Sequence, residues 1–261
     1  MAPAATPALR GGNAMTVLTR DENPWLRRIV AAPGSEFRLV CFPFAGGSAS
    51  YFRPLAIALA PDVETLAVQY PGRQERRAEA PLESIEQLAD AVADALRLVF
   101  DGRFAFFGHS LGALVAFEAA RRLEASGGPG PVHLFASAVS APSVFRPPTA
   151  HLADDETLLA ELSALGGTGR PPLAAVRADY RAVARYRPQP EARTACPLTA
   201  LAGTEDPLVP LDNSAAWCAH TEGGSTLRTY RGGHFYLDRH IPAVADAVTG
   251  TLAPYLPAVA H

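Results

Sequence analysis

Short apolar runs alternate with segments of helical periodicity along most of this chain. Buried strands are predicted where an apolar run of strand length is bounded by turn residues, at 38–42, 63–69, 104–107, 132–139, 198–202 and 226–230. Helices are predicted where apolar residues recur every three or four positions, at 51–59, 83–99, 111–123 and 241–256. Because strands that alternate with helices assemble as parallel βαβ units, we expect an α/β fold with a mostly parallel, doubly wound sheet.

One segment interrupts this alternation. Residues 143–195 separate two predicted strands and are far longer than an ordinary connection. Asp154 and Asp155 are placed to cap a first helix, and a second helical pattern carries Val176 and Tyr180. The insertion leaves the sheet at the edge where α/β proteins bind ligands, so we interpret it as a lid. The alternative is a helical pair that only enlarges the core.

The chain is expected to hold one domain after an N-terminal extension. Residues 1–22 precede the first patterned segment, and 1–14 are rich in Pro and Ala and lack the apolar centre of a signal peptide. We therefore expect disorder over 1–22, with translation starting at Met1 or Met15. Residues 23–261 contain no repeat and no linker, and no apolar run is long enough to span a bilayer. The three cysteines have no paired spacing, which is typical of reduced thiols in the cytoplasm.

The composition excludes several classes of function. The net charge is −3, so the chain has no basic field that would attract nucleic acid or an anionic membrane. All 23 basic residues are Arg, because the sequence contains no Lys. A lysine Schiff base and a Walker-type phosphate loop both require the missing amine. His and Cys are not clustered at metal-binding spacing, and we expect neither a metal nor an organic cofactor.

The segment Gly108-His109-Ser110-Leu111-Gly112 matches the G-x-S-x-G pattern of a nucleophile elbow. In this turn the serine lies between a strand and a helix, and the glycines leave space for a bend that lifts Oγ above the sheet edge. The pattern follows the apolar run at 104–107 and opens a helical pattern, which is the context that the motif requires. We therefore predict an α/β-hydrolase fold with Ser110 as its nucleophile.

A serine hydroxyl needs a base, and seven histidines compete for that role. His234 alone lies in a Gly-rich loop directly after the last predicted strand, where this fold places its base. The acid is expected after the preceding strand, where Asp206 lies at the turn of a loop and its neighbour Glu205 is an alternative. The acid would hold the imidazole in the correct tautomer and stabilise its charged form.

Hydrolysis through a serine also needs two backbone donors for the oxyanion. We expect one donor to be the N–H of Leu111, directly after the nucleophile. The second is expected in the loop after the first predicted strand, from Ala45 or, as the alternative, from Phe44. Side-chain identity does not decide between these two residues, because the donor is a backbone group.

Five motifs follow one another in a characteristic order. They are FPFAGGSAS at 42–50, QYPGRQERR at 69–77, GHSLGA at 108–113, GTEDPLVP at 203–210 and GGHFYL at 232–237. Together they resemble the type II thioesterases, stand-alone enzymes that serve polyketide synthases and non-ribosomal peptide synthetases in antibiotic biosynthesis. The resemblance extends over residues 23–256.

The resemblance implies hydrolysis of acyl groups from the phosphopantetheine arm of acyl or peptidyl carrier proteins, which clears stalled or misprimed synthases. By the same resemblance, Ser110, Asp206 and His234 are the triad and residues 143–195 form the lid. We expect a cytoplasmic monomer whose partners are the carrier proteins. The run Arg73, Arg76 and Arg77 either meets an acidic carrier protein or belongs to a solvated loop in which Arg73 binds backbone carbonyls.

Three other functions share some of these features. A generic esterase or lipase on small free esters would need the same triad, but the lid and the segment Pro71-Gly72-Arg73 favour the thioesterase. A macrocyclising thioesterase would be fused to a carrier domain, and the chain has no Asp-Ser dipeptide to carry phosphopantetheine. A binding protein on a hydrolase scaffold would not need an intact triad.

Overall fold

The structure, a computed structural model, describes residues 23–99, 103–148, 154–165 and 171–256. Its centre is a seven-stranded sheet with the strand order β1-β3-β2-β4-β5-β6-β7. The strands are β1 (Leu26–Val30), β2 (Arg38–Phe42), β3 (Glu64–Val68), β4 (Phe104–His109), β5 (Leu134–Ser137), β6 (Leu198–Gly203) and β7 (Ser225–Tyr230). β1 runs antiparallel to β3, and the remaining neighbours pair in parallel. The prediction of a mostly parallel sheet is therefore confirmed.

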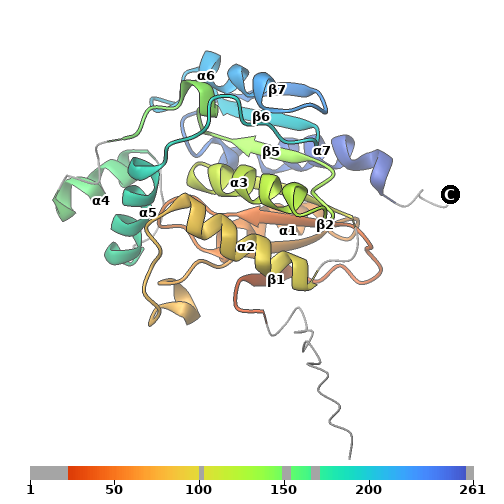
Figure 1. Cartoon of the computed structure of the whole chain (residues 1–261), viewed down its shortest axis with the longest axis horizontal. Helices are drawn as coiled ribbons and strands as arrows, with labels where there is room; N and C mark the ends of the chain where they lie inside the picture. The colour runs from red at the N-terminus through yellow and green to blue at the C-terminus, as the bar shows by residue number, and fades with distance from the viewer. Residues whose placement is uncertain (1–22, 100–102, 149–153, 166–170, 257–261) are drawn as a thin grey trace, which may run out of the picture.

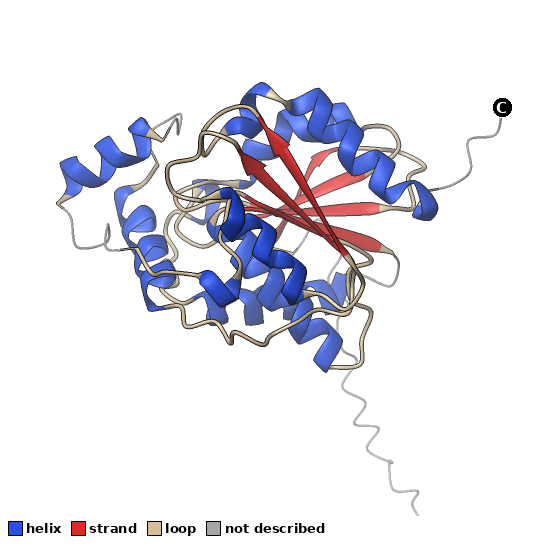
Figure 2. Cartoon of the chain, turned by 90° about the horizontal axis from the view of Figure 1, so that it is seen from above, coloured by secondary structure: helices blue, strands red, loops and turns tan. Residues whose placement is uncertain are grey.

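Helices cover both faces of this sheet (Figures 1 and 2). They are α1 (Arg53–Leu59), α2 (Ile85–Val99), α3 (Leu111–Ala125), α4 (Asp155–Ala164), α5 (Leu173–Arg185), α6 (Leu211–Ala215) and α7 (Ile241–Leu252). On one face α2 and α3 pack against the strands, and on the other face α1 packs beside α7. The result is the helix–sheet–helix sandwich of a doubly wound α/β protein.

The sheet divides the core into two layers, and β2 shows how the sequence produces them. Leu39 and Cys41 pack on the side of α1 and α7, and Val40 and Phe42 pack on the side of α2 and α3. All four side chains are fully buried. Successive side chains of a strand point to opposite faces, so a strand covered on both faces is apolar at every position. Each such side chain contributes about 1.5–3 kcal/mol when it is buried.

The sequence pattern does not predict β1. Its residues read LRRIV, and two consecutive arginines interrupt the apolar run. β1 lies at the edge of the sheet, where Arg27 forms an ion pair with Glu75 and Arg28 forms one with Glu64. Charged side chains are common on edge strands, because only one side of such a strand pairs with a neighbour. A search for fully buried strands therefore misses it.

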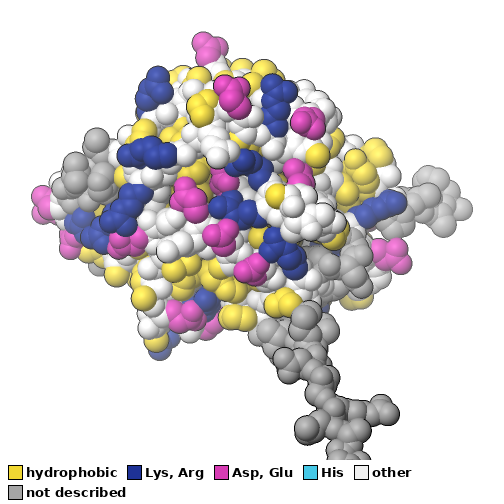
Figure 3. Space-filling model, viewed as in Figure 1, with side chains coloured by type: hydrophobic (Ala, Val, Ile, Leu, Met, Phe, Trp, Pro, Cys, Tyr) yellow, Lys and Arg dark blue, Asp and Glu magenta, His cyan; other side chains and the backbone are white. Residues whose placement is uncertain are grey.

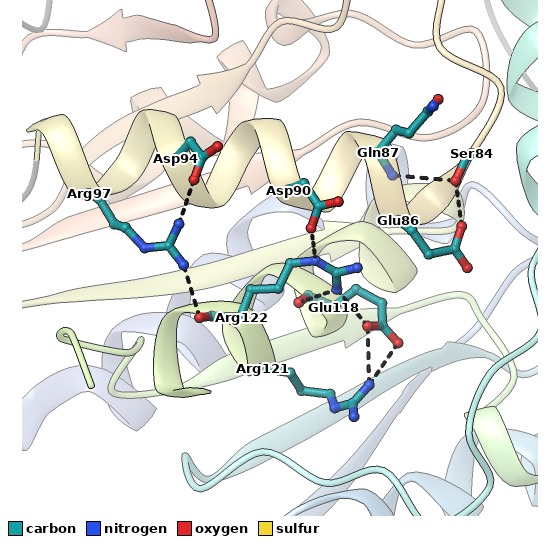
Figure 4. Close-up of polar contacts among 9 residues, drawn as sticks. All are labelled: Ser84, Glu86, Gln87, Asp90, Asp94, Arg97, Glu118, Arg121 and Arg122. Carbon is teal, nitrogen blue, oxygen red and sulfur yellow. Dashed lines mark hydrogen bonds and ion pairs between the residues drawn. The ribbon is translucent and has the colours of Figure 1, made fainter. Parts of the chain in front are cut away.

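An ion pair and a hydrogen bond tie α2 to α3 on the outer side of their layer (Figure 4). Arg122 of α3 binds Asp90 of α2, and Arg97 of α2 donates to the backbone oxygen of Arg122 at 3.0 Å. The buried carboxylate of Glu118 lies 2.7 Å from Arg122 and 3.1 Å from Arg121. Figure 3 shows this face of the molecule with basic and acidic side chains interspersed. Opposite charges thus lie side by side where the two helices meet, which weakens repulsion between like charges.

The helices α4 and α5 form a unit at one end of the molecule, beside the layers of the sheet (Figures 1 and 2). Asp154 caps α4, since its Oδ1 accepts a hydrogen bond from the Thr157 amide at 2.8 Å, and the predicted cap is confirmed. The two helices share a small apolar cluster of Leu158, Leu162 and Val176. The insertion therefore has a core of its own as well as contacts to the rest of the molecule.

Two predicted regions lie wholly or partly outside the described residues. The expected extension, 1–22, is one of them, and the predicted lid, 143–195, includes 149–153 and 166–170. Within the described ranges, no helix combines the length and apolar character needed to cross a membrane. Nor do three or more His, Cys, Asp or Glu side chains come together there in an arrangement that would hold a metal ion.

Candidate active site

Ser110 lies at the turn between β4 and α3. Its backbone has φ 55° and ψ −123°, a conformation that residues other than glycine rarely adopt. A Cβ atom at Gly108 would lie 2.3 Å from Ala113 Cα, and one at Gly112 would lie 2.0 Å from the backbone oxygen of Phe42. Neither position has room for a side chain, which explains why this turn needs glycine on both sides of the serine.

Three side chains form a hydrogen-bonded series at this turn. Ser110 Oγ lies 3.0 Å from His234 Nε2, and His234 Nδ1 lies 2.8 Å from Asp206 Oδ2. The side chains of His234 and Asp206 are 5% and 1% exposed. Because a carboxylate only accepts hydrogen bonds, Nδ1 carries the proton and Nε2 presents its lone pair to the Ser110 hydroxyl. An imidazole in this tautomer is able to remove the serine proton.

Backbone contacts hold the loop of the acid against the loop of the histidine. A Cβ atom at Gly203 would lie 2.4 Å from the backbone oxygen of Gly233. The Glu205 amide donates to the backbone oxygen of Gly232 at 2.8 Å. Gly203 before the acid and the glycines of the histidine loop thus permit an approach that side chains would prevent.

Asp206 and Glu205, the two alternatives for the acid, point to different partners. The Leu208 amide donates to Asp206 Oδ1 at 2.8 Å, and Asp206 Oδ2 faces the imidazole of His234. The side chain of Glu205 is 60% exposed, and its carboxylate lies 3.4 Å from Arg231. The structure therefore brings Asp206, and not Glu205, to the histidine.

The predicted backbone donors line the same cavity as the serine. This cavity has a volume of about 350 Å³, and its wall includes Phe44, Ala45, Ser110, Leu111 and His234. Its other side chains are mostly apolar and come partly from the insertion, among them Leu114, Val139, Phe145, Leu162, Tyr180 and Val183. An apolar cavity of this size beside a few polar groups is typical of a small-molecule site.

A second imidazole lies next to His234. The ring centroid of His109 is 5.5 Å from that of His234, and His109 is completely buried. Its Nδ1 lies 2.9 Å from Ser137 Oγ, which lies 2.6 Å from the hydroxyl of Tyr236. Burial lowers the pKa of His109 well below its ordinary value, and the proximity of His234 lowers it further. His109 thus stays neutral and places no positive charge beside the imidazole of His234.

Two of the three arginines in the run Arg73, Arg76 and Arg77 are bound within the molecule. The side chains of Arg73 and Arg76 are buried, whereas Arg77 is exposed. Arg73 donates to the backbone oxygen of Pro71 at 2.6 Å and forms an ion pair with Asp179 of α5. Arg76 lies over an indole ring and pairs with a neighbouring carboxylate. The alternative in which Arg73 binds a backbone carbonyl is therefore confirmed, whereas docking of a carrier protein on the run stays a prediction for which only the side chain of Arg77 is exposed.

His220 joins the two ends of the insertion, a role that the sequence does not indicate. Its Nδ1 lies 2.7 Å from the backbone oxygen of Ala192, and its Nε2 accepts a hydrogen bond from the Ser143 amide at 3.1 Å. Burial lowers the pKa of His220, although the bond to Ala192 opposes this effect. These three residues are far apart in the sequence, so no local pattern marks their contact.

Several known proteins are similar in sequence to this chain over most of its length. The family model described as a thioesterase domain matches residues 37–252. The thioesterase PikA5 of Streptomyces venezuelae is 49% identical over 232 residues, which are 85% of this chain and 83% of that protein. A probable cadicidin biosynthesis thioesterase of Streptomyces griseus is 41% identical over 91% of this chain and 69% of its own length.

Solved structures share the fold as well. The type II thioesterase BorB from the borrelidin biosynthetic cluster has a TM-score of 0.80 and 45% identity, covering 88% of this chain and 97% of its own. YbtT, a type II thioesterase from the yersiniabactin pathway, has a TM-score of 0.78 and 28% identity, covering 87% and 97%. With the family model spanning the strands β2 to β7, the elbow and the histidine loop, this chain belongs to the thioesterase family and is a type II thioesterase with an α/β-hydrolase fold.

Proposed function

We propose that this enzyme removes acyl groups from the phosphopantetheine arm of acyl or peptidyl carrier proteins, and so clears stalled or misprimed synthases. The proposal rests on the likeness to type II thioesterases of polyketide and peptide pathways. The single observation that carries the chemistry is the hydrogen-bonded series from Ser110 through His234 to Asp206 beside an apolar cavity.

In the first half of the reaction, Ser110 Oγ attacks the thioester carbonyl carbon while its proton passes to His234 Nε2. The C–S bond then breaks, and the imidazolium returns that proton to the departing thiolate, which leaves as the free thiol of the arm. The product on the enzyme is an acyl ester of Ser110. Asp206 keeps the imidazole in the productive tautomer and stabilises its positive charge through the 2.8 Å hydrogen bond.

In the second half, His234 removes a proton from water, and the resulting hydroxide attacks the acyl ester. The C–O bond to Ser110 breaks, Oγ recovers a proton from His234, and the carboxylic acid departs. In both halves the N–H groups of Ala45 and Leu111 stabilise the oxyanion. This assignment is supported by the position of both residues in the wall of the cavity that contains Ser110.

The insertion acts as a lid over the acyl group. Leu162 of α4 and Tyr180 and Val183 of α5 form part of the wall of the cavity, which supports a role in excluding water and contacting the chain. On this proposal, the single domain of residues 23–261 works as a cytoplasmic monomer. The free thiols of Cys41, Cys196 and Cys218 fit the reducing environment of that compartment.

The test is the release of acyl groups from a loaded carrier protein. An acyl carrier protein is charged with acetyl, propionyl and longer chains, and deacylation is followed by intact mass for the wild type and for Ser110→Ala. The expected result is rapid release by the wild type, and a rate for Ser110→Ala that falls by about 10⁴-fold or more. The same acyl groups on a small free thiol show how much the carrier protein contributes.

The outcomes separate the candidate functions. Deacylation of the carrier protein that is far faster than that of the free thioester supports the editing role. Equal or faster cleavage of free esters would reject the carrier as the preferred substrate and favour a general esterase. A folded protein that cleaves neither substrate would instead point to a binding role for the hydrolase scaffold.

A further inference from the structure

We propose that Asp179 of the insertion is a positioning residue for the oxyanion hole, because its carboxylate, held by Arg73, fixes the backbone amide of Gly46 directly after Ala45. The proposal depends on the function assigned above only in taking Ser110 as the nucleophile and Ala45 as an oxyanion donor. It adds that the docking of α5 and the alignment of the Ala45 amide are coupled.

Asp179 is the point at which three segments meet. Its Oδ2 accepts a hydrogen bond from the Gly46 amide at 2.6 Å and forms an ion pair with Arg73 through the same oxygen. The Asp179 side chain is 0% exposed and that of Arg73 is 1% exposed. Arg73 is in turn anchored by its 2.6 Å bond to the backbone oxygen of Pro71. The carboxylate therefore has little freedom to move away from the Gly46 amide.

Two hydrogen bonds fix the peptide planes on either side of Ala45. The Gly47 amide donates to the backbone oxygen of Phe44 at 2.9 Å, which sets the plane that contains the Ala45 N–H. The Gly46 amide bound to Asp179 sets the next plane, which contains the Ala45 carbonyl. A peptide unit is rigid and planar. When both units are fixed, the Ala45 N–H can therefore point in only one direction. A donor aligned before the reaction needs no reorganisation when negative charge develops.

Gly46 also allows α5 to approach the loop closely. Its φ is +79°, and a Cβ atom there would lie 2.9 Å from Val176 Cγ2. The lid helix thus packs directly on the residue that follows the oxyanion donor. Withdrawal of α5 would remove Asp179 from Gly46 and release the peptide plane next to the donor, so that a displaced lid leaves an incompletely formed oxyanion hole.

A matched pair of double variants tests this role. Arg73→Met combined with Asp179→Leu replaces the buried ion pair by apolar side chains, a change that folded proteins often tolerate. In the second variant, Arg73→Met is combined with Asp179→Asn. Asparagine has nearly the same shape as leucine but retains an oxygen that accepts a hydrogen bond from the Gly46 amide. Both are compared with the wild type on a short-chain acyl thioester of a small thiol, so that the result does not depend on recognition of the carrier protein.

We expect the Leu variant to lose about 10- to 100-fold in kcat at unchanged KM, and the Asn variant to recover most of that loss. The Leu variant should also bind an alkyl trifluoromethyl ketone about 10- to 100-fold more weakly, because the hemiketal that this ketone forms with Ser110 carries an oxyanion. Thermal unfolding midpoints should be similar for the two variants. Equal activity of the Leu and Asn variants, or a change confined to KM, would overturn the proposal.

A measurement on the wild type keeps the proposal testable if both variants unfold. An amide bound to a carboxylate at 2.6 Å should give a Gly46 proton resonance shifted far downfield, with hydrogen exchange much slower than in an open loop. Rapid exchange of the Gly46 amide in a folded wild-type sample would refute the positioning role. Loss of carrier specificity with an intact Leu-versus-Asn difference would reject only the function proposed above.

Discussion

Replacing Asp206 by Asn tests the assignment of the acid most directly, because the two side chains have the same shape. The Leu208 amide donates to Asp206 Oδ1 at 2.8 Å, so the side-chain oxygen of the introduced asparagine would take that position. The NH₂ group would then face His234 Nδ1, where Oδ2 now lies at 2.8 Å. A donor at this place requires an unprotonated Nδ1, which moves the ring proton to Nε2.

This tautomer leaves no lone pair for the Ser110 hydroxyl at the 3.0 Å contact. Loss of the base by this route lowers kcat by about 10⁴-fold, which corresponds to about 5 kcal/mol of transition-state stabilisation. The assay is hydrolysis of an acyl thioester at saturating substrate and neutral pH, with the thermal unfolding midpoint as a check on folding. Because binding of the substrate does not involve the imidazole proton, KM should change little.

Glu205→Gln is the matched control. Its carboxylate is exposed and lies near Arg231, so this substitution should leave kcat within about twofold of the wild type. The reasoning is refuted if Asp206→Asn retains more than about a tenth of the wild-type kcat. It is equally refuted if the loss appears in Glu205→Gln instead.

Three further predictions concern the elbow, the helix pair and the pH dependence of stability. Gly112→Ala should destabilise the fold by about 3 kcal/mol and slow the labelling of Ser110 by a fluorophosphonate probe, because the added Cβ would lie 2.0 Å from a backbone oxygen. Glu118→Gln should lower the free energy of unfolding in urea by about 1–2 kcal/mol, whereas the exposed Asp94→Asn should change it by less than about 0.5 kcal/mol. Burial lowers the pKa of His133 from its ordinary value of 6.5 to about 4, so the unfolded chain binds more protons between these values and stability should fall as the pH falls. His133→Gln should reduce this slope by at most about 1.4 kcal/mol per pH unit, and an unchanged slope in urea titrations at pH 4–7 would contradict the prediction.

Local patterns along the chain were sufficient to predict the layers of the fold and the position of the elbow. A continuous apolar run indicates a strand that is buried on both faces, and an apolar residue at every third or fourth position indicates a helix that is buried on one face. Each of these patterns can be recognised within about ten residues. The elbow is equally local, because Gly108 and Gly112 are required by clashes next to the serine itself. Thus the sequence could predict the mostly parallel sheet and the elbow at Ser110.

The edge strand and the arginine run show where local patterns fail. β1 carries Arg27 and Arg28 because one of its edges is open, so it lacks the apolar signature of the central strands. Arginine is a residue type that usually lies at the surface, yet Arg73 is buried against the carboxylate of Asp179, which lies 106 residues further along the chain. The sequence around Arg73 or around Asp179 does not indicate that the two residues form an ion pair.

The sequence by itself determined which residue types carry the chemistry and in which order they follow the strands. The tertiary structure decided which atoms meet: that Asp206 rather than its neighbour reaches His234, and that α5 supplies a carboxylate to the loop beside the serine. The physical reason is that hydrogen bonds and ion pairs act over a few ångströms of space. The residues that form them here are separated by 28 to 133 positions in the chain.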